Sequence, residues 1–172
     1  YVDPDHPREW RKAVRKNTRA IFAEVLTNPV MRVLNIPSLA KLAQEHGIAL
    51  LVDSTFASPV NFRPLEHGAD IVITSATKYL NGHSDVIAGA VAGTASIMDE
   101  VTRLRRAWGP SIDPHAAWLT ERGLKTMALR VELANRHAIA VAKWASSQSA
   151  FAAVHYPGLR SQTVGGTEPL HA

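Results

Sequence analysis

The sequence lacks cysteine, has few aromatic residues and contains no long hydrophobic run. Without cysteine the chain forms no disulfide and offers no thiolate to a metal, which is usual for cytoplasmic proteins. No apolar segment approaches the roughly 18 residues of a membrane-spanning helix. The first residues also lack the basic-then-apolar pattern of a secretory signal. We therefore expect a cytoplasmic protein that has no membrane partner.

Positive charge is in moderate excess, with 19 Lys and Arg residues against 15 Asp and Glu residues. Such an excess can serve nucleic-acid binding. However, the basic residues gather mainly in 8–19 and 103–106 at helix-like spacing, with few aromatic residues between them, as on a solvated helix face. We expect no nucleic-acid partner, and a mild positive field would also suit an anionic cofactor.

Short apolar runs alternate with helix-periodic segments along the 172 residues, which is typical of one α/β layered domain. The run 48–52 is apolar throughout, which indicates a strand covered on both faces, as in a parallel sheet. We predict strands at 18–24, 48–52, 71–73, 86–92 and 151–155. We predict helices around 10–14, at 37–46, at 96–108, after 113 and over 124–144.

Several polar and glycine residues predict where these helices begin and end. Asp5 or Asp3 can cap the first helix, and Ser96 and Asp113 can cap two later ones. Gly47 is a natural C-terminal stop for the helix that precedes the second strand.

Polar residues follow two of the predicted strands directly, where an α/β sheet usually collects its chemistry. Asp53 ends the second strand, and Ser75, Thr77 and Lys78 follow the third. An amine near an apolar strand end can be desolvated, which favours its neutral form and lets it attack a carbonyl to form a Schiff base. The two hydroxyls could donate to a phosphate, and a carboxylate can pair with a protonated ring nitrogen. The residues alone leave an equally good alternative, in which Lys78 is a surface lysine and Asp53 caps a turn.

Other candidate sites are weaker. The eight histidines form no H-E-x-x-H pattern or close pair, so we expect no metal site. The sequence contains no G-x-S-x-G elbow, and its Gly165-Gly166 pair is not followed by a P-loop lysine.

A set of motifs covers nearly the whole chain up to about residue 160. The longest is S-A-T-K-Y-L-N-G-H-S-D-V-I-A-G over 75–89, and it resembles the cofactor-lysine signature of the pyridoxal-phosphate (PLP) enzymes of Cys/Met metabolism. This transsulfuration family includes cystathionine synthases and lyases and methionine γ-lyase. The motifs that agree with it in order and spacing are T-N-P-V-M-R-V at 27–33, V-D-S-T-F at 52–56, L-E-H-G-A-D at 65–70, R-G-L-K-T at 122–126 and Y-P-G-L at 156–159.

The resemblance implies a role for each matching residue. Lys78 would form the Schiff base with PLP and later move protons, and Asp53 would pair with the pyridinium nitrogen. Ser75 and Thr77 would bind the cofactor phosphate, and Asn28 would hydrogen-bond the ring oxygen. The implied fold is the large domain of fold-type-I PLP-dependent transferases, with a mainly parallel sheet flanked by helices.

The sequence also departs from the family pattern. Glu121 stands where an apolar residue is usual and would need a partner if it were buried, and Thr163 to Ala172 do not resemble the family's continuation. The resemblance implies an incomplete large domain at 1–148 that ends in the interdomain helix. Residues 149–172 would then be the start of a largely missing small C-terminal domain and an atypical tail. We therefore expect the isolated chain to be inactive.

The implied activity is elimination or replacement at the β- or γ-carbon of sulfur-containing or homoserine-derived amino acids. The segment N-G-H-S-D, from Asn81 to Asp85, looks more like the cystathionine branches than the sulfhydrylases. The implied assembly is a homo-oligomer or a pairing with a complementary chain. The alternative is a non-catalytic fragment or interaction subunit that keeps the fold and pairs with another PLP-enzyme chain.

Overall fold

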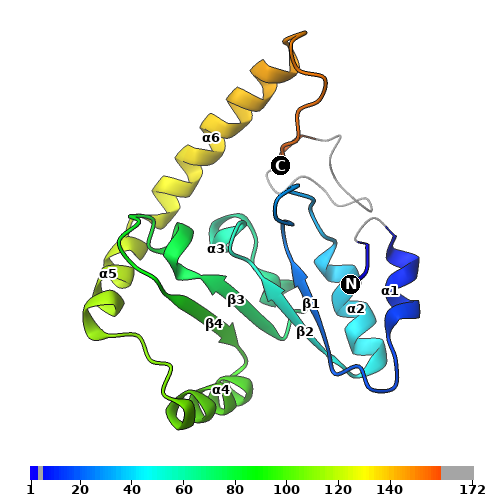
Figure 1. The fold of residues 1–172 in the computed structure, drawn as a ribbon, viewed down its shortest axis with the longest axis vertical. Coiled ribbons are helices and arrows are strands. Elements are labelled where there is room, and N and C mark those ends of the chain that lie inside the picture. Colours follow the sequence, from blue (N-terminus) through cyan, green and yellow to red (C-terminus); the bar gives the residue numbers. More distant parts are fainter. Residues whose placement is uncertain (4–5, 160–172) are drawn as a thin grey trace.

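A four-stranded sheet forms the centre of the protein, which we describe from a computed structural model for residues 1–3 and 6–159. The strands are β1 (Ala20–Glu24), β2 (Ala49–Asp53), β3 (Ile71–Ser75) and β4 (Gly89–Gly93), and they lie in this order in the sheet. β1, β2 and β3 are parallel, and β4 pairs with β3 antiparallel. The predicted α/β class with a mainly parallel sheet is confirmed (Figure 1).

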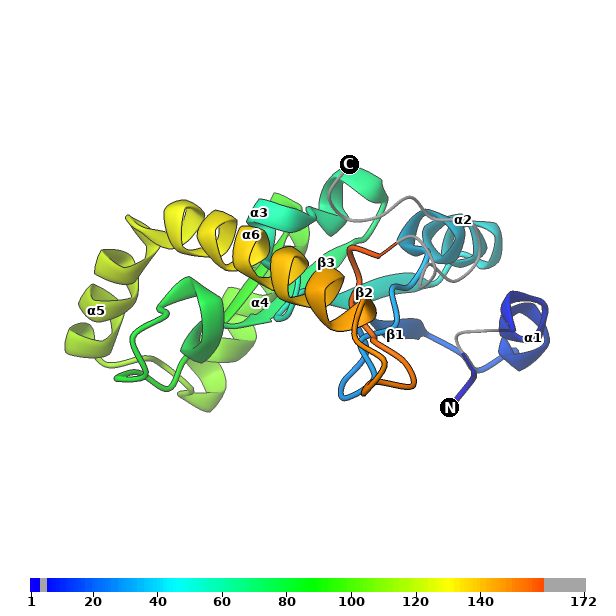
Figure 2. The same ribbon diagram turned by 90° about the horizontal axis from the view of Figure 1, so that it is seen from above.

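Within the described residues, six helices and two short helical segments lie around this sheet. In Figure 1, α6 runs past the end of the sheet where the parallel strands finish, and Figure 2 shows α1 and α5 at opposite ends of the molecule. No helix among the described residues is long and apolar enough to span a membrane. The elements are α1 (Pro7–Ala13), α2 (Ile36–His46), α3 (Ser58–Asn61), η1 (Pro64–His67), η2 (Ala76–Leu80), α4 (Ala95–Trp108), α5 (Pro114–Leu124) and α6 (Met127–Ser146).

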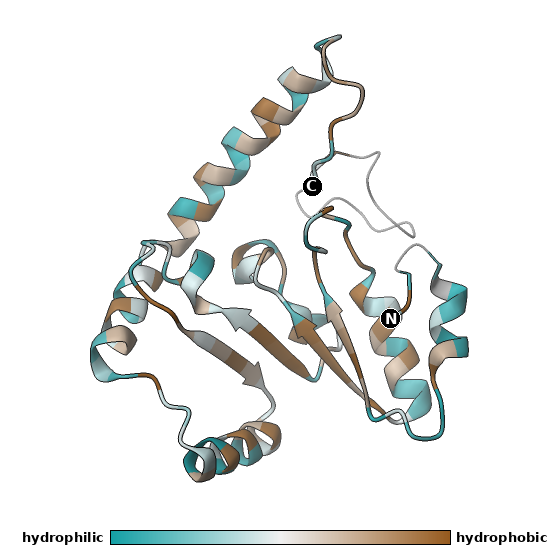
Figure 3. Cartoon of the chain, in the orientation of Figure 1, coloured by the Kyte–Doolittle hydropathy of each residue, from teal (hydrophilic) through white to brown (hydrophobic). Residues whose placement is uncertain are grey.

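The hydrophobic core lies between α2 and the first strands. Ile36, Leu39 and Leu42 recur at helical spacing and face Leu50 and Val52 of β2, and all five side chains are buried. Figure 3 shows the same concentration of hydrophobic residues on β2. This packing fixes β2, and with it the position at which Asp53 ends the strand.

Local capping explains the bounds of α2. The Asn35 side chain accepts a hydrogen bond from the Ser38 N–H at 3.0 Å and so satisfies one free donor of the first turn. Gly47 ends the helix in the left-handed conformation, at φ +61°, as its position after the last apolar residue predicted.

The two faces of the sheet differ in burial, which corrects the prediction that the strand at 48–52 is covered on both faces. In β2 only Leu50 and Val52 are buried, while Ala49, Leu51 and Asp53 are half-buried. On β1 the side chain of Phe22 is 61% exposed. Alternate residues point to opposite faces of a strand, so the described residues cover one face fully and the other only in part.

Several predicted element boundaries and caps are wrong. α1 begins after His6, which makes no side-chain cap, and Asp5 lies outside the described residues. α4 begins after Thr94, so Ser96 lies in its first turn and is not the cap. The Asp113 cap of α5 is confirmed, because its Oδ1 accepts the N–H groups of His115 and Ala116 at 3.0 Å each.

One further segment differs from the prediction in kind. Residues 151–155 form no strand, because this apolar run has no neighbouring strand to pair with among the described residues. The long helix predicted at 124–144 is confirmed as α6, although it begins three residues later, at Met127, and the helix predicted after 113 is α5. β1 starts at Ala20, two residues later than predicted, and β4 lies at 89–93 instead of 86–92. Glu121 is exposed and needs no buried partner.

The predicted tail 163–172 lies outside the described residues. The division into a large domain at 1–148 and a second part at 149–172 stays a prediction, although α6 ends close to it, at Ser146.

Candidate active site

The polar residues of interest lie at one edge of the sheet, where two neighbouring parallel strands end. Asp53 is the last residue of β2, and Ser75 is the last residue of β3. The loop after β2 is tied to the end of β3, because the Ser54 N–H donates to the Ile73 carbonyl at 2.9 Å and the Ser75 N–H donates to Thr55 Oγ1 at 2.8 Å. The structure therefore places the two strand ends side by side, as the alternation of elements predicted.

Lys78 lies in η2, a wide turn that follows β3 without a gap and is kinked at Lys78 itself, whose φ of −91° and ψ of −119° are not helical. The Asn81 N–H donates to the Ala76 carbonyl at 3.0 Å, which is the five-residue spacing of a π-turn. The Gly82 N–H closes the segment on the Lys78 carbonyl at 2.7 Å. Such turns are frequent at functional sites, and this one carries the amine beyond the sheet edge.

Thr77 ties this turn to the strand that returns along β3. Its Oγ1 accepts the Ala88 N–H at 2.9 Å and lies 3.3 Å from the Ala88 carbonyl, to which the Thr77 N–H also donates at 3.2 Å. The Ala88 carbonyl therefore keeps a donor if the Thr77 hydroxyl turns toward another acceptor. Donation to an anion from this hydroxyl would cost only the longer of its two hydrogen bonds.

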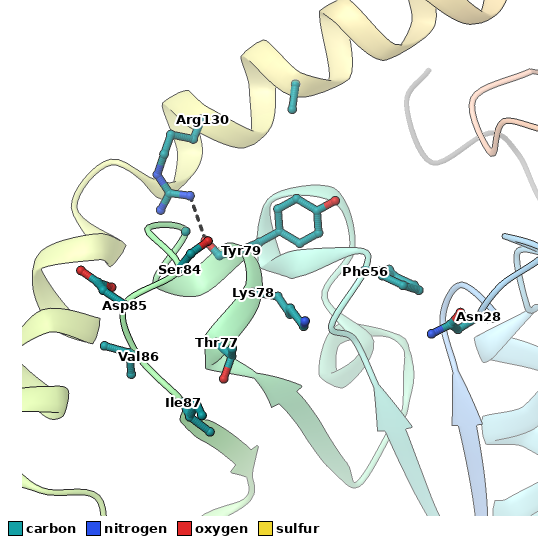
Figure 4. A pocket seen from close by; sticks show the side chains of 12 residues that line it. Asn28, Phe56, Thr77, Lys78, Tyr79, Ser84, Asp85, Val86, Ile87 and Arg130 are labelled. Atoms are coloured by element: carbon teal, nitrogen blue, oxygen red, sulfur yellow. Dashed lines mark hydrogen bonds between the residues drawn. The ribbon is translucent and has the colours of Figure 1, made fainter.

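An open cavity of about 1010 Å³ lies over η2. Figure 4 shows the Lys78 amine directed into it between Thr77 and Phe56, with Asn28 on the far side. Of the five predicted site residues, the structure brings Asn28, Thr77 and Lys78 to this cavity. Asp53 and Ser75 end the adjoining strands and are not among its lining residues.

The surroundings of Lys78 correct one expectation. Its side chain is exposed, so the described residues alone do not desolvate the amine as its place after an apolar strand predicted. Asp53 is half-buried, and its Oδ1 accepts the Thr55 N–H at 2.8 Å. Within the part of the chain that the structure describes, its Oδ2 has no hydrogen bond and can accept another donor.

Two residues that the sequence did not indicate also line the cavity. Tyr79 follows the lysine directly. Arg130 extends to the cavity from α6, although it lies more than 50 positions from Tyr79 in the chain. No pattern in the sequence links an arginine of the long helix to η2, because the contact depends on how α5 and α6 pack. No group of three or more His, Asp or Glu that could hold a metal occurs within the described ranges.

The chain is similar to known proteins of one family. Residues 1–165 match the family model for Cys/Met metabolism PLP-dependent enzymes. The chain is 40% identical to a probable cystathionine gamma-synthase of Herpetosiphon aurantiacus over 94% of its length and 51% of the relative's. It is 42% identical to the L-methionine gamma-lyase of Porphyromonas gingivalis over 93% of its length and 41% of the relative's. The chain thus spans about half of these relatives or less.

Solved structures show the same likeness. The crystal structure of metB from Corynebacterium glutamicum superposes with a TM-score of 0.89 at 38% identity, covering 94% of this chain and 42% of that one. The cystathionine gamma-lyase from Lactobacillus plantarum, complexed with L-serine, gives a TM-score of 0.85 at 38% identity, over 93% of this chain and 42% of that one. The chain belongs to the family of Cys/Met metabolism PLP-dependent enzymes, whose cofactor is pyridoxal 5′-phosphate.

Proposed function

We propose that the protein carrying this chain catalyses elimination or replacement at the β- or γ-carbon of sulfur-containing or homoserine-derived amino acids. One observation carries the proposal: the Lys78 amine opens into the cavity at the sheet edge, which Thr77 and Asn28 also line. The relatives are named as synthases and lyases of cystathionine and as a methionine lyase, which supports this class of substrate.

Lys78 would hold the cofactor through Nζ. When bound, PLP supplies an electron sink that stabilises negative charge next to an amino nitrogen. Nζ, once free, would take the α-proton of the amino acid and return a proton to the product. Its exposure in the described chain leaves room for a cofactor and a substrate to approach it.

Asp53 would keep a proton on the ring nitrogen of the cofactor. Its Oδ1 is oriented by the Thr55 N–H at 2.8 Å, so the carboxylate is held at the end of β2 with Oδ2 able to accept. A carboxylate next to the ring nitrogen would favour its protonated form, because opposite charges stabilise each other.

Thr77 and Ser75 would bind the phosphate, and Asn28 would bind the ring oxygen. The Thr77 hydroxyl can turn to donate, since the Ala88 carbonyl keeps the Thr77 N–H as its donor. The Asn28 backbone is fixed by its N–H bond to Glu24 Oε2 at 3.0 Å, which leaves its exposed side-chain amide directed to the cavity. We propose that the protein forms an oligomer, either with copies of itself or with a complementary chain.

Borohydride trapping on Lys78 tests this proposal. With PLP added, the protein as its gene encodes it should develop a visible absorbance band, and reduction should leave the cofactor mass on Lys78 in peptide mass spectrometry. Lys78→Ala should abolish the band, because a methyl group has no amine to join the aldehyde. A Lys78→Ala loss in turnover of at least about a thousandfold is expected for a residue that touches the reacting atoms.

Lys41→Ala provides the matched control, since Lys41 is exposed on α2 and does not line the cavity. This variant should keep both the band and the trapped label. A wild-type protein that stays colourless with Lys78 unmodified, even beside a partner chain, would contradict the proposal and favour the non-catalytic interaction subunit.

A further inference from the structure

Arg130 on α6 makes an unusual number of hydrogen bonds to the segment that carries Lys78. Its Nη1 donates to the Tyr79 carbonyl at 3.1 Å, as the dashed line in Figure 4 shows. Its Nη2 lies within 3.4 Å of the Leu80 carbonyl and 3.3 Å of the Asn81 carbonyl. One guanidinium thus spans the three carbonyls that directly follow the lysine.

The same guanidinium is itself held from the other side. Its Nη2 donates to the Gly123 carbonyl at 2.9 Å, and its Nε donates to Thr126 Oγ1 at 3.1 Å. Both partners lie at the junction of α5 and α6. Arg130 therefore connects this junction to η2, and a planar fork of five donors is suited to bridging several oxygens at once.

Two glycines make room for this arrangement. Gly82 has φ +73°, and a Cβ built there would collide with the Arg130 guanidinium. Gly123 is buried, and its Cβ would collide with the Asn81 backbone carbonyl. Asn81 itself is 1% exposed and donates from Nδ2 to Asp85 Oδ1 at 2.7 Å. The chain on the C-terminal side of Lys78 is thus packed closely around the guanidinium.

An arginine that lines a cavity can instead bind an anion directly. Here all three guanidinium nitrogens already donate to the protein. Their acceptors are five oxygens, of which four are backbone carbonyls. Binding an anion would require Arg130 to give up these carbonyls, and within residues 1–3 and 6–159 the Tyr79 and Leu80 carbonyls have no other hydrogen-bond donor. The hydrogen-bond pattern therefore favours a role in holding the backbone over a role as an anion ligand.

We propose that Arg130 is a positioning residue, which fixes the backbone after Lys78 and thereby holds the amine in place for the cofactor. The inference rests on the proposed function of Lys78. A loosened η2 segment lets Nζ move away from the cofactor aldehyde, and misplacement by about 1 Å can cost up to about a hundredfold in a reaction.

The test compares Arg130→Ala with the wild type in the protein as its gene encodes it, loaded with PLP. We expect the variant to release PLP about tenfold faster and to show a visible circular dichroism band several times weaker, because hydrogen bonds to a charged group are lost and the cofactor is less fixed. Arg130→Lys should recover part of the band, since one ammonium can bond only some of the carbonyls.

Pyridoxal, which lacks the phosphate, separates positioning from anion binding. Loss of a positioning residue should weaken the retention of pyridoxal and of PLP by the same factor. Loss of a phosphate ligand should weaken PLP alone, and that result would overturn the proposal. Arg136→Ala is the matched control, because Arg136 lies exposed on the same helix and its side chain makes no hydrogen bond or ion pair within residues 1–3 and 6–159. It should behave as the wild type.

Gly82→Ala tests the same contact from the other side if Arg130→Ala does not fold. Gly109→Ala is its control, because Gly109 has a similar φ of +82° but no atom within 4 Å of a Cβ. Gly82→Ala should release PLP faster than Gly109→Ala. Equal release by these two variants, or an Arg130→Ala protein with unchanged band and release, would overturn the inference. A wild type that fails to trap PLP on Lys78 would instead refute the proposed function.

Discussion

Two regions of the molecule are packed very differently: the first runs from Trp10 to Ala69, and the second contains the helices α4 to α6. The core cluster of buried residues lies entirely between Trp10 and Ala69. In contrast, α4 has no buried residue, and α6 buries only Val131 and Ala142. Figure 3 shows mixed hydrophilic and hydrophobic colour along α6, whereas β2 is mostly hydrophobic. The first region carries its own hydrophobic core, and the second does not within the described residues.

Polar contacts hold the second region to the first. Arg130 bonds the backbone beyond Lys78, and the side-chain amides of Asn61 and Asn135 join α3 to α6, with Asn135 Nδ2 donating to Asn61 Oδ1 at 2.8 Å. Lys78 lies at the boundary. Its strand is positioned by hydrophobic burial, and the turn that carries it is positioned largely by hydrogen bonds.

The largest expected effect is on the core of the first region. Leu50→Ala should lower the free energy of unfolding by about 3 kcal/mol, because Leu50 is fully buried and its loss leaves a cavity. Chemical denaturation measures this change.

Leu129→Ala is the comparison in the second region, because Leu129 on α6 is 70% exposed. It should change the free energy of unfolding by less than about 0.5 kcal/mol. Equal losses for the two variants would show that α6 packs as tightly as β2, and the contrast between the regions would be wrong.

An intermediate loss of stability is expected where α5 contacts the backbone of the segment after Lys78. Gly123→Ala should cost about 1–2 kcal/mol, because the added methyl collides with the Asn81 carbonyl. The gain of up to about 1 kcal/mol in helix propensity opposes this cost but does not cancel it. The denaturation midpoint of the variant checks the sign.

Gly89→Ala sets the baseline for this experiment, since a Cβ at Gly89 meets no atom within 4 Å. Its midpoint should stay close to the wild type. If Gly123→Ala proved as stable as Gly89→Ala, α5 would not approach η2 as closely as described.

The sequence predicted what depends on local pattern. The apolar runs that became β2 and β3, the Gly47 stop and the Asp113 cap are all decided by neighbouring residues, and the structure contains each of them. The placement of Asp53 and Ser75 at one sheet edge followed from the same local reading, because parallel strands end together.

Contacts between distant segments could not be predicted in this way. The run 151–155 has strand-like residues, but a strand exists only where another strand offers its hydrogen bonds. The antiparallel direction of β4 and the reach of Arg130 to the Tyr79 carbonyl likewise depend on how segments far apart in the chain pack. The exposure of Lys78 differed from expectation for the same reason.

The smallest expected effect concerns the pH dependence of stability where the segment after α6 returns to it. Burial raises the pKa of Tyr156 above its ordinary value of 10.0, and the charge of Tyr79 raises it further. The folded state thus retains the phenol proton to higher pH than the unfolded state does. The stability that follows is fully present below pH 10 and is lost as the pH rises through the folded pKa.

Tyr156→Phe should therefore lose less stability than the wild type as the pH rises above 10, measured in denaturant titrations. Tyr1→Phe, at an exposed position, should leave the slope unchanged. Parallel slopes for the wild type and Tyr156→Phe would mean that the 156–158 segment does not pack on α6, and would place it with the weakly held part of the molecule.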